Sequence, residues 1–267
     1  MSPLEFFIDS KMFALSSFEF EGMVKIQAKA DVEEKVLRSL GWTKLNFLNK
    51  RRARIEIWFR DTEESEIQMY YEFGIFSTIY GGEDMPNWIT NRSMGPSISF
   101  TIPSPPNKFR GLNFCCVLTS GFMDQLLDLP VIIINNITKN LIWIYQHYLD
   151  IIYLGDKCFT LLSHWIFGMN EMECGDHVTV TVPIPYLYVD QVTKECGVGF
   201  VYENGSKDEE EDDLGYYKSW NHIIGGDLTG FQFKTGEYTL HTRRFMDHGN
   251  EVDQYFHELV DGACYKG

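Results

Sequence analysis

The chain has 267 residues, of which 44% are hydrophobic and 15% aromatic, so it can bury a substantial core in one large or two small domains. Its formal net charge at pH 7 is -15. An acidic surface repels phosphate backbones and anionic lipid headgroups, so this charge argues against nucleic acid and membranes as partners.

The first part of the chain, 1–67, carries short apolar pieces without a complete repeat, and one short helix is predicted near 31–41. Asp31 is a suitable N-cap with a glutamate three residues later, and Gly41 supplies a C-terminal stop. The basic run at 50–54 fits a nuclear-import signal, a contact for an acidic partner, or a solvated loop.

Strand patterns dominate from residue 68 to residue 203. Residues 97–102 and 177–182 alternate apolar and polar side chains, as half-buried strands do. Further strands are predicted at 131–134, 141–145, 159–167 and 198–202, the first two joined by a polar hairpin loop at 135–140. About eight strands without long intervening helices predict a mainly β protein. We therefore expect an antiparallel β-sandwich, jelly-roll or Ig-like, with short flanking helices.

The acidic segment 204–215 follows this region. Six consecutive carboxylates at 208–213 repel one another too strongly to pack, so an exposed loop or linker is expected. The remainder, 216–267, is predicted to be a β/α extension, with strand-like alternation at first and a helix at 251–260. The pattern leaves open whether this extension completes the sandwich or forms an appendage.

Motifs for catalysis or metal binding are weak throughout the sequence. The seven histidines form no His-x-x-x-His pair, and no cysteine pair has the spacing of a structural zinc site. There is neither a phosphate-binding P-loop nor a nucleophile elbow, and the glycine pairs fit turns. We expect no enzyme, no metal and no cofactor. Paired carboxylates for glycoside hydrolysis remain conceivable, because an acidic chain offers many.

Cysteine use and the N-terminal stretch indicate a compartment. No apolar run approaches the ~20 residues that span a bilayer, and charged residues interrupt the apolar ones at the N-terminus. Cys115 and Cys116 are neighbours in a predicted strand, so their side chains should point to opposite faces. We expect reduced thiols and a cytoplasmic location, with the nucleus as a second one.

Two sequence blocks carry a family resemblance. The first runs through 80–114 with a Gly-Gly turn, a Pro-x-Trp motif, an alternating strand and Gly-Leu-Asn-Phe-Cys; the second lies at 194–203. The motif residues are Gly82, Asp84, Pro86, Trp88, Phe100, Gly111, Phe114, Cys196, Gly197, Val201 and Tyr202. This pattern resembles the jelly-roll and Ig-like domain (C-JID) that follows the leucine-rich repeats in plant TIR-type NLR disease-resistance receptors. One departure is Ile89, where the family has an aromatic residue after the tryptophan.

The resemblance implies a non-enzymatic recognition module inside the plant cell, either part of an immune receptor or a truncated relative acting as adaptor or decoy. Its expected partner is a pathogen effector or a component of the host receptor. The TIR segment, the nucleotide switch and the full repeat array have no counterpart here, so their activities are not carried over. The residues expected to contact a partner are Asn107, Lys108, Arg110, Asn136, Lys139, Glu209 and Glu210. The alternative is a carbohydrate-binding or glycan-hydrolysing jelly roll.

Trp88 has two interpretations within this resemblance. It fills one end of the sandwich core, or it is an exposed aromatic that stacks on a sugar or contacts a partner. The first is favoured, because a Pro-x-Trp turn leads directly into a strand.

Overall fold

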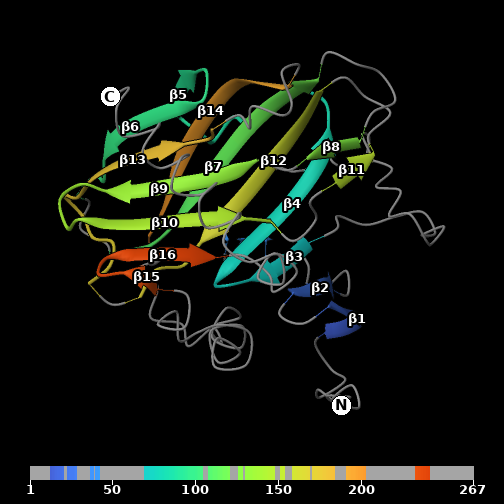
Figure 1. The fold of residues 1–267 in the computed structure, drawn as a ribbon, viewed down its shortest axis with the longest axis horizontal. Helices are drawn as coiled ribbons and strands as arrows, with labels where there is room; N and C mark the ends of the chain where they lie inside the picture. Colours follow the sequence, from blue (N-terminus) through green and yellow to red (C-terminus); the bar gives the residue numbers. More distant parts are fainter. Residues whose placement is uncertain are drawn as a thin grey trace.

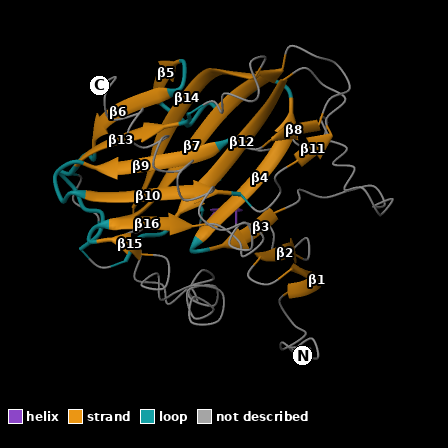
Figure 2. Cartoon of the chain, in the orientation of Figure 1, coloured by secondary structure: helices purple, strands orange, loops and turns teal. Residues whose placement is uncertain are grey.

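The computed structural model describes residues 13–20, 23–28, 37–38, 40–42, 69–104, 108–120, 126–128, 130–147, 151–153, 158–168, 170–183, 191–202 and 232–240. Most of these residues lie in strands, as Figure 2 shows. The prediction of a mainly β protein is confirmed. No helix in this part of the chain is long and apolar enough to cross a membrane.

The larger sheet has eight strands, and each strand is antiparallel to its neighbours. Their order is β1 (Phe13–Phe20), β2 (Met23–Ala28), β3 (Met69–Glu72), β4 (Ile75–Gly81), β12 (Cys158–Trp165), β7 (Phe109–Ser120), β14 (Gln191–Tyr202) and β5 (Asn91–Met94). The centre of this sheet joins strands that are far apart in the sequence, because β7 lies between β12 and β14.

The smaller sheet has six strands. Their order is β15 (Gln232–Lys234), β16 (Glu237–Leu240), β10 (Leu141–Gln146), β9 (Val131–Asn136), β13 (His177–Thr181) and β6 (Ser97–Thr101). All neighbours are antiparallel except β10 and β16, which are parallel. A separate pair is formed by β8 (Leu126–Asp128) and β11 (Ile151–Tyr153).

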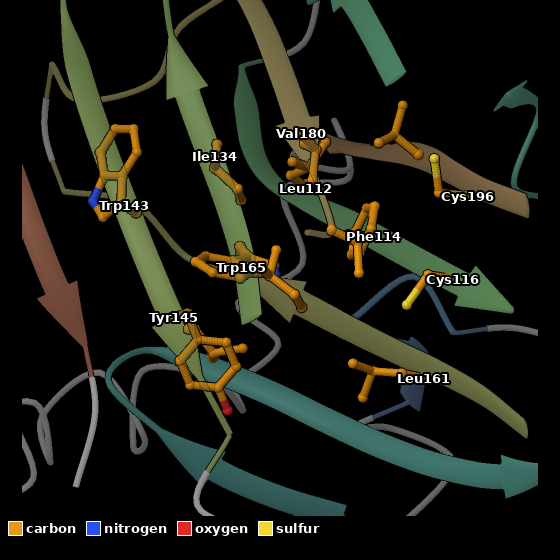
Figure 3. Close-up of a cluster of buried hydrophobic side chains, with 14 of the residues drawn as sticks. Leu112, Phe114, Cys116, Ile134, Trp143, Tyr145, Leu161, Trp165, Val180 and Cys196 are labelled. Atoms are coloured by element: carbon orange, nitrogen blue, oxygen red, sulfur yellow. The ribbon is translucent and has the colours of Figure 1, made fainter. Parts of the chain in front are cut away.

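The two sheets stack face to face and enclose one apolar core (Figure 1). Trp165 of β12 lies in the middle of this core among side chains from both sheets, including Phe114 of β7 and Ile134 of β9 (Figure 3). Its ring meets the ring of Tyr145 edge to face, with centroids 5.4 Å apart. Aromatic and branched side chains fill the space between two pleated sheets efficiently, which accounts for their alternation along these strands.

The outer face of the eight-stranded sheet is also covered. Leu40 and Trp42 are 0% and 2% exposed, and the Trp42 Nε1–H donates to Asn113 Oδ1 at 3.1 Å. Asn113, on β7, in turn donates from Nδ2 to the Leu40 carbonyl at 3.0 Å. The described segment 40–42 is therefore fixed to this sheet by buried hydrogen bonds as well as by apolar contact.

Local geometry explains how the chain turns into this covering segment. The Trp42 amide donates to the Leu37 carbonyl at 2.7 Å, the Gly41 amide donates to the Arg38 carbonyl at 3.0 Å, and Gly41 has a φ of 71°. These are the two bonds and the left-handed residue of a Schellman helix end. The predicted stop at Gly41 is confirmed, whereas residues 31–36 of the predicted helix lie outside the described residues.

Several sequence predictions have a clear outcome. The strands expected at 97–102, 177–182, 131–134 and 141–145 are β6, β13, β9 and β10, and the last two form the expected hairpin. The total of about eight strands predicted for 68–203 was too low, because the described residues of that region contain twelve, β3 to β14. Both sheets also take strands from outside 68–203, namely β1, β2, β15 and β16. The basic run at 50–54, the acidic segment and the 251–260 helix lie outside the described residues.

Candidate functional site

One end of the sandwich gathers three connections that are far apart in the sequence. They are the 137–140 turn between β9 and β10, the 170–176 turn before β13, and the chain around 102–108 between β6 and β7, of which 105–107 are not described. We call the described residues of these three connections the loop end. Two of the three correspond to the predicted recognition loops, so the structure brings those loops together.

The 137–140 turn is built by its asparagines. The Asn136 side-chain oxygen accepts a hydrogen bond from the Lys139 amide at 3.2 Å, which is a local turn that asparagine favours. Asn140 adopts a φ of 54°, a left-handed conformation that asparagine tolerates better than most residues. The asparagines that predicted a hairpin loop therefore also stabilise the turn, one through a side-chain hydrogen bond and the other through its left-handed backbone.

Asn136 is the residue that joins two of the connections. Its side chain is 0% exposed, and its Nδ2 donates to Asp176 Oδ2 at 2.7 Å and to the Glu171 carbonyl at 3.0 Å. The same Asp176 oxygen accepts from the Glu173 amide at 2.9 Å. Asn136 was predicted to contact a partner, but its side chain is fully occupied inside the fold.

Lys139 is held by the same network. Its Nζ lies 2.7 Å from Glu173 Oε2, 2.7 Å from the Asn170 carbonyl and 3.4 Å from Asp176 Oδ2. Its charge is thus balanced within the loop end, and its side chain is only 20% exposed. Lys139 positions the 170–176 turn and leaves Glu173, whose side chain is 54% exposed, on the surface.

The third connection, around 102–108, is joined to the 170–176 turn by backbone hydrogen bonds. The Ile102 amide donates to the Asp176 carbonyl at 3.0 Å, and the Gly175 amide donates to the Ile102 carbonyl at 2.9 Å. Farther along, the Tyr202 hydroxyl donates to the Pro103 carbonyl at 3.2 Å. The 170–176 turn, which the sequence analysis did not select, therefore connects the two predicted loops. The Gly175-Asp176 pair in the sequence could have identified this turn.

The solvent-facing side chains of the loop end are mixed in character. Ile137 is 52% exposed and is one of three exposed large hydrophobic residues in the described part of the chain. The other exposed residues of the loop end are Pro103, Ser104, Lys108, Thr138, Asn140, Asn170, Glu173, Cys174 and Gly175, and the exposed His177 follows at the start of β13. Arg110 lies at the start of β7 and is half-buried, whereas Asn107, Glu209 and Glu210 lie outside the described residues. The loop end thus presents one apolar side chain with polar groups around it.

The motif residues around 82–89 lie on the outer face of the eight-stranded sheet. Met85 and Ile89 are 8% and 1% exposed and rest on Gly197 and Gly199 of β14. A Cβ added at Gly197 would lie 2.6 Å from Ile89 Cγ2 and 2.8 Å from Met85 Sδ. Gly197 therefore permits a contact that no other residue allows without movement.

Trp88 does not fill the core as predicted. Its side chain is half-buried, and the neighbouring Ile89 takes the enclosed position. Ile89, the residue that departs from the pattern of the resemblance, is thus the one that anchors the turn. Arg92 of β5 secures the same turn, because its guanidinium donates to the carbonyls of Ile89 and Pro86 at 2.8 and 2.9 Å.

The remaining motif residues have structural positions. Gly82 has a φ of 101°, and a Cβ at Gly111 would lie 2.6 Å from the His164 ring. Phe100, Phe114 and Cys196 face the core. Asp84 is exposed, Pro86 is buried, and Val201 and Tyr202 are half-buried at the end of β14. These residues therefore form turns or pack inside the fold, and packing and turn formation explain why the motif contains them.

A second charged cluster lies at the opposite end of the eight-stranded sheet. Glu83 forms an ion pair with Lys194 and accepts a hydrogen bond from Cys158 Sγ at 3.1 Å. The hydrogen bond from Lys194 lowers the pKa of the Glu83 carboxyl below its usual value. All three side chains are at least partly exposed, so the pair is a surface feature with little effect on stability.

Buried titratable groups serve the fold. Burial lowers the pKa of His147 to about 3, and its Nε2 lies 2.8 Å from Ser77 Oγ. Burial raises the pKa of Cys196 to about 12 and raises that of Cys115 well above its usual value. The five described cysteines are free thiols, and Cys116 faces the core while Cys115 lies on the outer face. Because these pKa values lie far from 7, the groups stay neutral and do not change protonation state near pH 7.

Within the described ranges, no group of three or more His, Cys, Asp or Glu side chains is arranged to hold a metal ion. Comparison with models of known protein families and with characterised proteins gave no match. The geometry of the loop end is therefore the main basis for an assignment.

Proposed function

We propose that this chain is a non-enzymatic recognition module that binds a protein partner through the loop end. The observation that carries the proposal is the joining of three connections by the Asn136–Asp176 network and adjoining backbone hydrogen bonds at one end of the sandwich. Rigid scaffolds with exposed connections are a common basis for recognition, because loops vary without disturbing the core.

Preorganisation supports a binding role for this end. Lys139, Asn136 and Asp176 fix the backbone of two turns before any partner arrives, so less conformational entropy is lost on binding. The fixed backbone presents Ile137 to solvent beside Thr138 and His177. A protein surface with an apolar pocket and hydrogen-bonding groups at its rim would complement this arrangement.

The described sheet faces fit the carbohydrate alternative less well. Leu40, Trp42, Met85 and Ile89 pack onto the outer face of the eight-stranded sheet. On the six-stranded sheet, β6 and β13 present serine, threonine and histidine, which offer no large planar surface for a sugar ring. The proposal extends to the cellular setting that the sequence resemblance implies: recognition of a pathogen effector, or of a receptor component, in the plant cytoplasm or nucleus.

The test uses the purified chain as bait in extracts from infected plant tissue, followed by direct binding of the captured protein. Ile137→Ser should weaken binding by about four- to tenfold, because about half of Ile137 is exposed and burying that half contributes about 0.8 to 1.5 kcal/mol. Val192→Ser is the matched control, since Val192 is similarly exposed, at 50%, but lies at the opposite end of β14.

Equal loss of binding in both variants, or no loss in either, would remove the loop end as the recognition site. Binding abolished by changes on the β6 and β13 face alone would instead favour a face-binding module, including one for glycans.

A further inference from the structure

Strand β6 ends the six-stranded sheet with one edge that no described strand pairs with. Hydrogen bonds at both ends of β6 fix the direction of its backbone groups: the Val182 amide donates to the Pro96 carbonyl at 2.7 Å, and the Ile102 amide donates to the Asp176 carbonyl at 3.0 Å. In an antiparallel ladder the bonded residues alternate. Ile98 and Phe100 therefore bond toward β13, whereas Ser97, Ser99 and Thr101 direct their amides and carbonyls outward.

The same three residues carry a row of hydroxyl groups on the outer face. Ser99 Oγ lies 2.9 Å from Thr179 Oγ1, and Ser97 Oγ lies 3.3 Å from Thr181 Oγ1. The pairing of β6 with β13 has no register shift, and β6 itself contains no charged residue and no proline. Natural sheets usually protect an exposed edge with such residues or with a bulge. This edge lacks those devices along 97–101.

We propose that β6 pairs antiparallel with β6 of a second copy of this chain, about a twofold axis at Ser99. In this register Ser99 faces Ser99 of the other copy, and Ser97 faces Thr101. Each outward residue then exchanges an amide donor and a carbonyl acceptor with its counterpart. The hydroxyl row continues across the junction with the same residue types that pair inside the sheet, so the edge is complementary to itself.

The residues next in the outward row define the length of the pairing. At one end the Gly95 amide already donates to the Lys194 carbonyl at 2.9 Å, and at the other end Pro103 has no amide hydrogen, so the ladder is confined to 97–101. Five paired residues bury well under about 1,200 Å², the lower range of specific interfaces, and the dimer is accordingly weak. Each copy carries a formal charge of -15, so the two copies repel at low salt and association strengthens as salt screens that repulsion.

The proposal is independent of the recognition function and is tested without any partner. Sedimentation velocity of the full chain, from about 10 µM to about 1 mM, should show a concentration-dependent shift from monomer to dimer that grows with salt. Ser99→Lys places two ammonium groups opposite each other at the twofold axis and should weaken the dimer by about tenfold or more. Thr179→Lys is the control, because Thr179 lies on the same face one strand inward and should leave dimerisation within about twofold.

Hydrogen exchange gives a second measurement that does not depend on a variant. The segment 97–101 should exchange more slowly at about 1 mM than at about 10 µM, while the amides of β13, which are already paired, stay unchanged. A monomer at every concentration and salt overturns the proposal. So does a dimer that is lost equally with Thr179→Lys and Ser99→Lys, since the contact would then be the sheet face.

Discussion

The contact between Ile89 and β14 predicts that the residue after Trp88, rather than Trp88 itself, stabilises the 82–89 turn. Ile89 is 1% exposed, and replacing a buried isoleucine by alanine costs about 2 to 5 kcal/mol of unfolding free energy. We expect about 3 kcal/mol for Ile89→Ala, because its methyl groups rest on glycines that cannot move in to fill the space. Trp88 is half-buried, so Trp88→Ala should cost about 2 kcal/mol or less.

Gly197 provides the partner for a double-mutant cycle. The methyl group in Gly197→Ala would lie 2.6 Å from Ile89 Cγ2 and 3.0 Å from the Asn91 carbonyl oxygen. Such crowding costs about 1 to 3 kcal/mol in the wild-type background. Because Ile89→Ala removes the closest atom, the same methyl should cost about 1 kcal/mol less there, so the double variant should be more stable than the sum of the single effects.

Urea unfolding at pH 7 measures these free energies, provided that the m-value stays constant across the variants. An Ile89→Ala cost below that of Trp88→Ala would refute the assignment of Ile89 as the anchor. Strict additivity with Gly197→Ala would show that the two residues do not touch in solution.

Three further predictions concern buried polar groups. Asn136→Ala should cost about 2 to 3 kcal/mol, because it removes a hydrogen bond to the buried Asp176 carboxylate; a loss below about 0.5 kcal/mol in urea unfolding would contradict this. His147 has a folded pKa of about 3 and an unfolded value near 6.5, so the unfolded state takes up the proton first as pH falls. Stability should therefore decline from about pH 6.5 toward pH 3, and His147→Gln should flatten that decline; an unchanged pH profile would speak against a buried neutral imidazole. Trp42→Phe should cost about 1 kcal/mol in thermal unfolding through the lost bond to Asn113, and full stability would place the segment 40–42 elsewhere.

Alternating strands were predictable because their pattern is local. Ser97–Thr101 and His177–Thr181 repeat polar and apolar residues with a period of two, and each has one face in the core. Continuously buried strands were harder to identify. Ile75–Gly81 is covered on both faces, so its serine and threonine are as buried as its isoleucines and no alternation marks it.

The candidate site was predictable only in part. The composition of 135–140 identified a turn, but it could not distinguish Asn136, which is buried, from Thr138, which is exposed. That difference depends on Asp176, forty residues later, which supplies the acceptor. Likewise, Trp88 was predicted to fill the core because a Pro-x-Trp turn leads into a strand, whereas the absence of a side chain at Gly197 gives the enclosed position to Ile89. In both cases the burial of a side chain depends on a residue far away in the sequence, Asp176 for Asn136 and Gly197 for Ile89.

The parallel pairing of β10 with β16 has a consequence for synthesis on the ribosome. Trp143 of β10 is stacked on Tyr238 of β16, with ring centroids 6.2 Å apart, although the two residues lie far apart in the sequence. While the intervening residues emerge from the ribosome, β10 can pair with β9 on one side, but its other edge has no partner strand until β16 is made. The six-stranded sheet is completed only when residues 237–240 leave the exit tunnel, so a nonsense codon shortly before them would expose an aromatic edge of the core to chaperones and proteases.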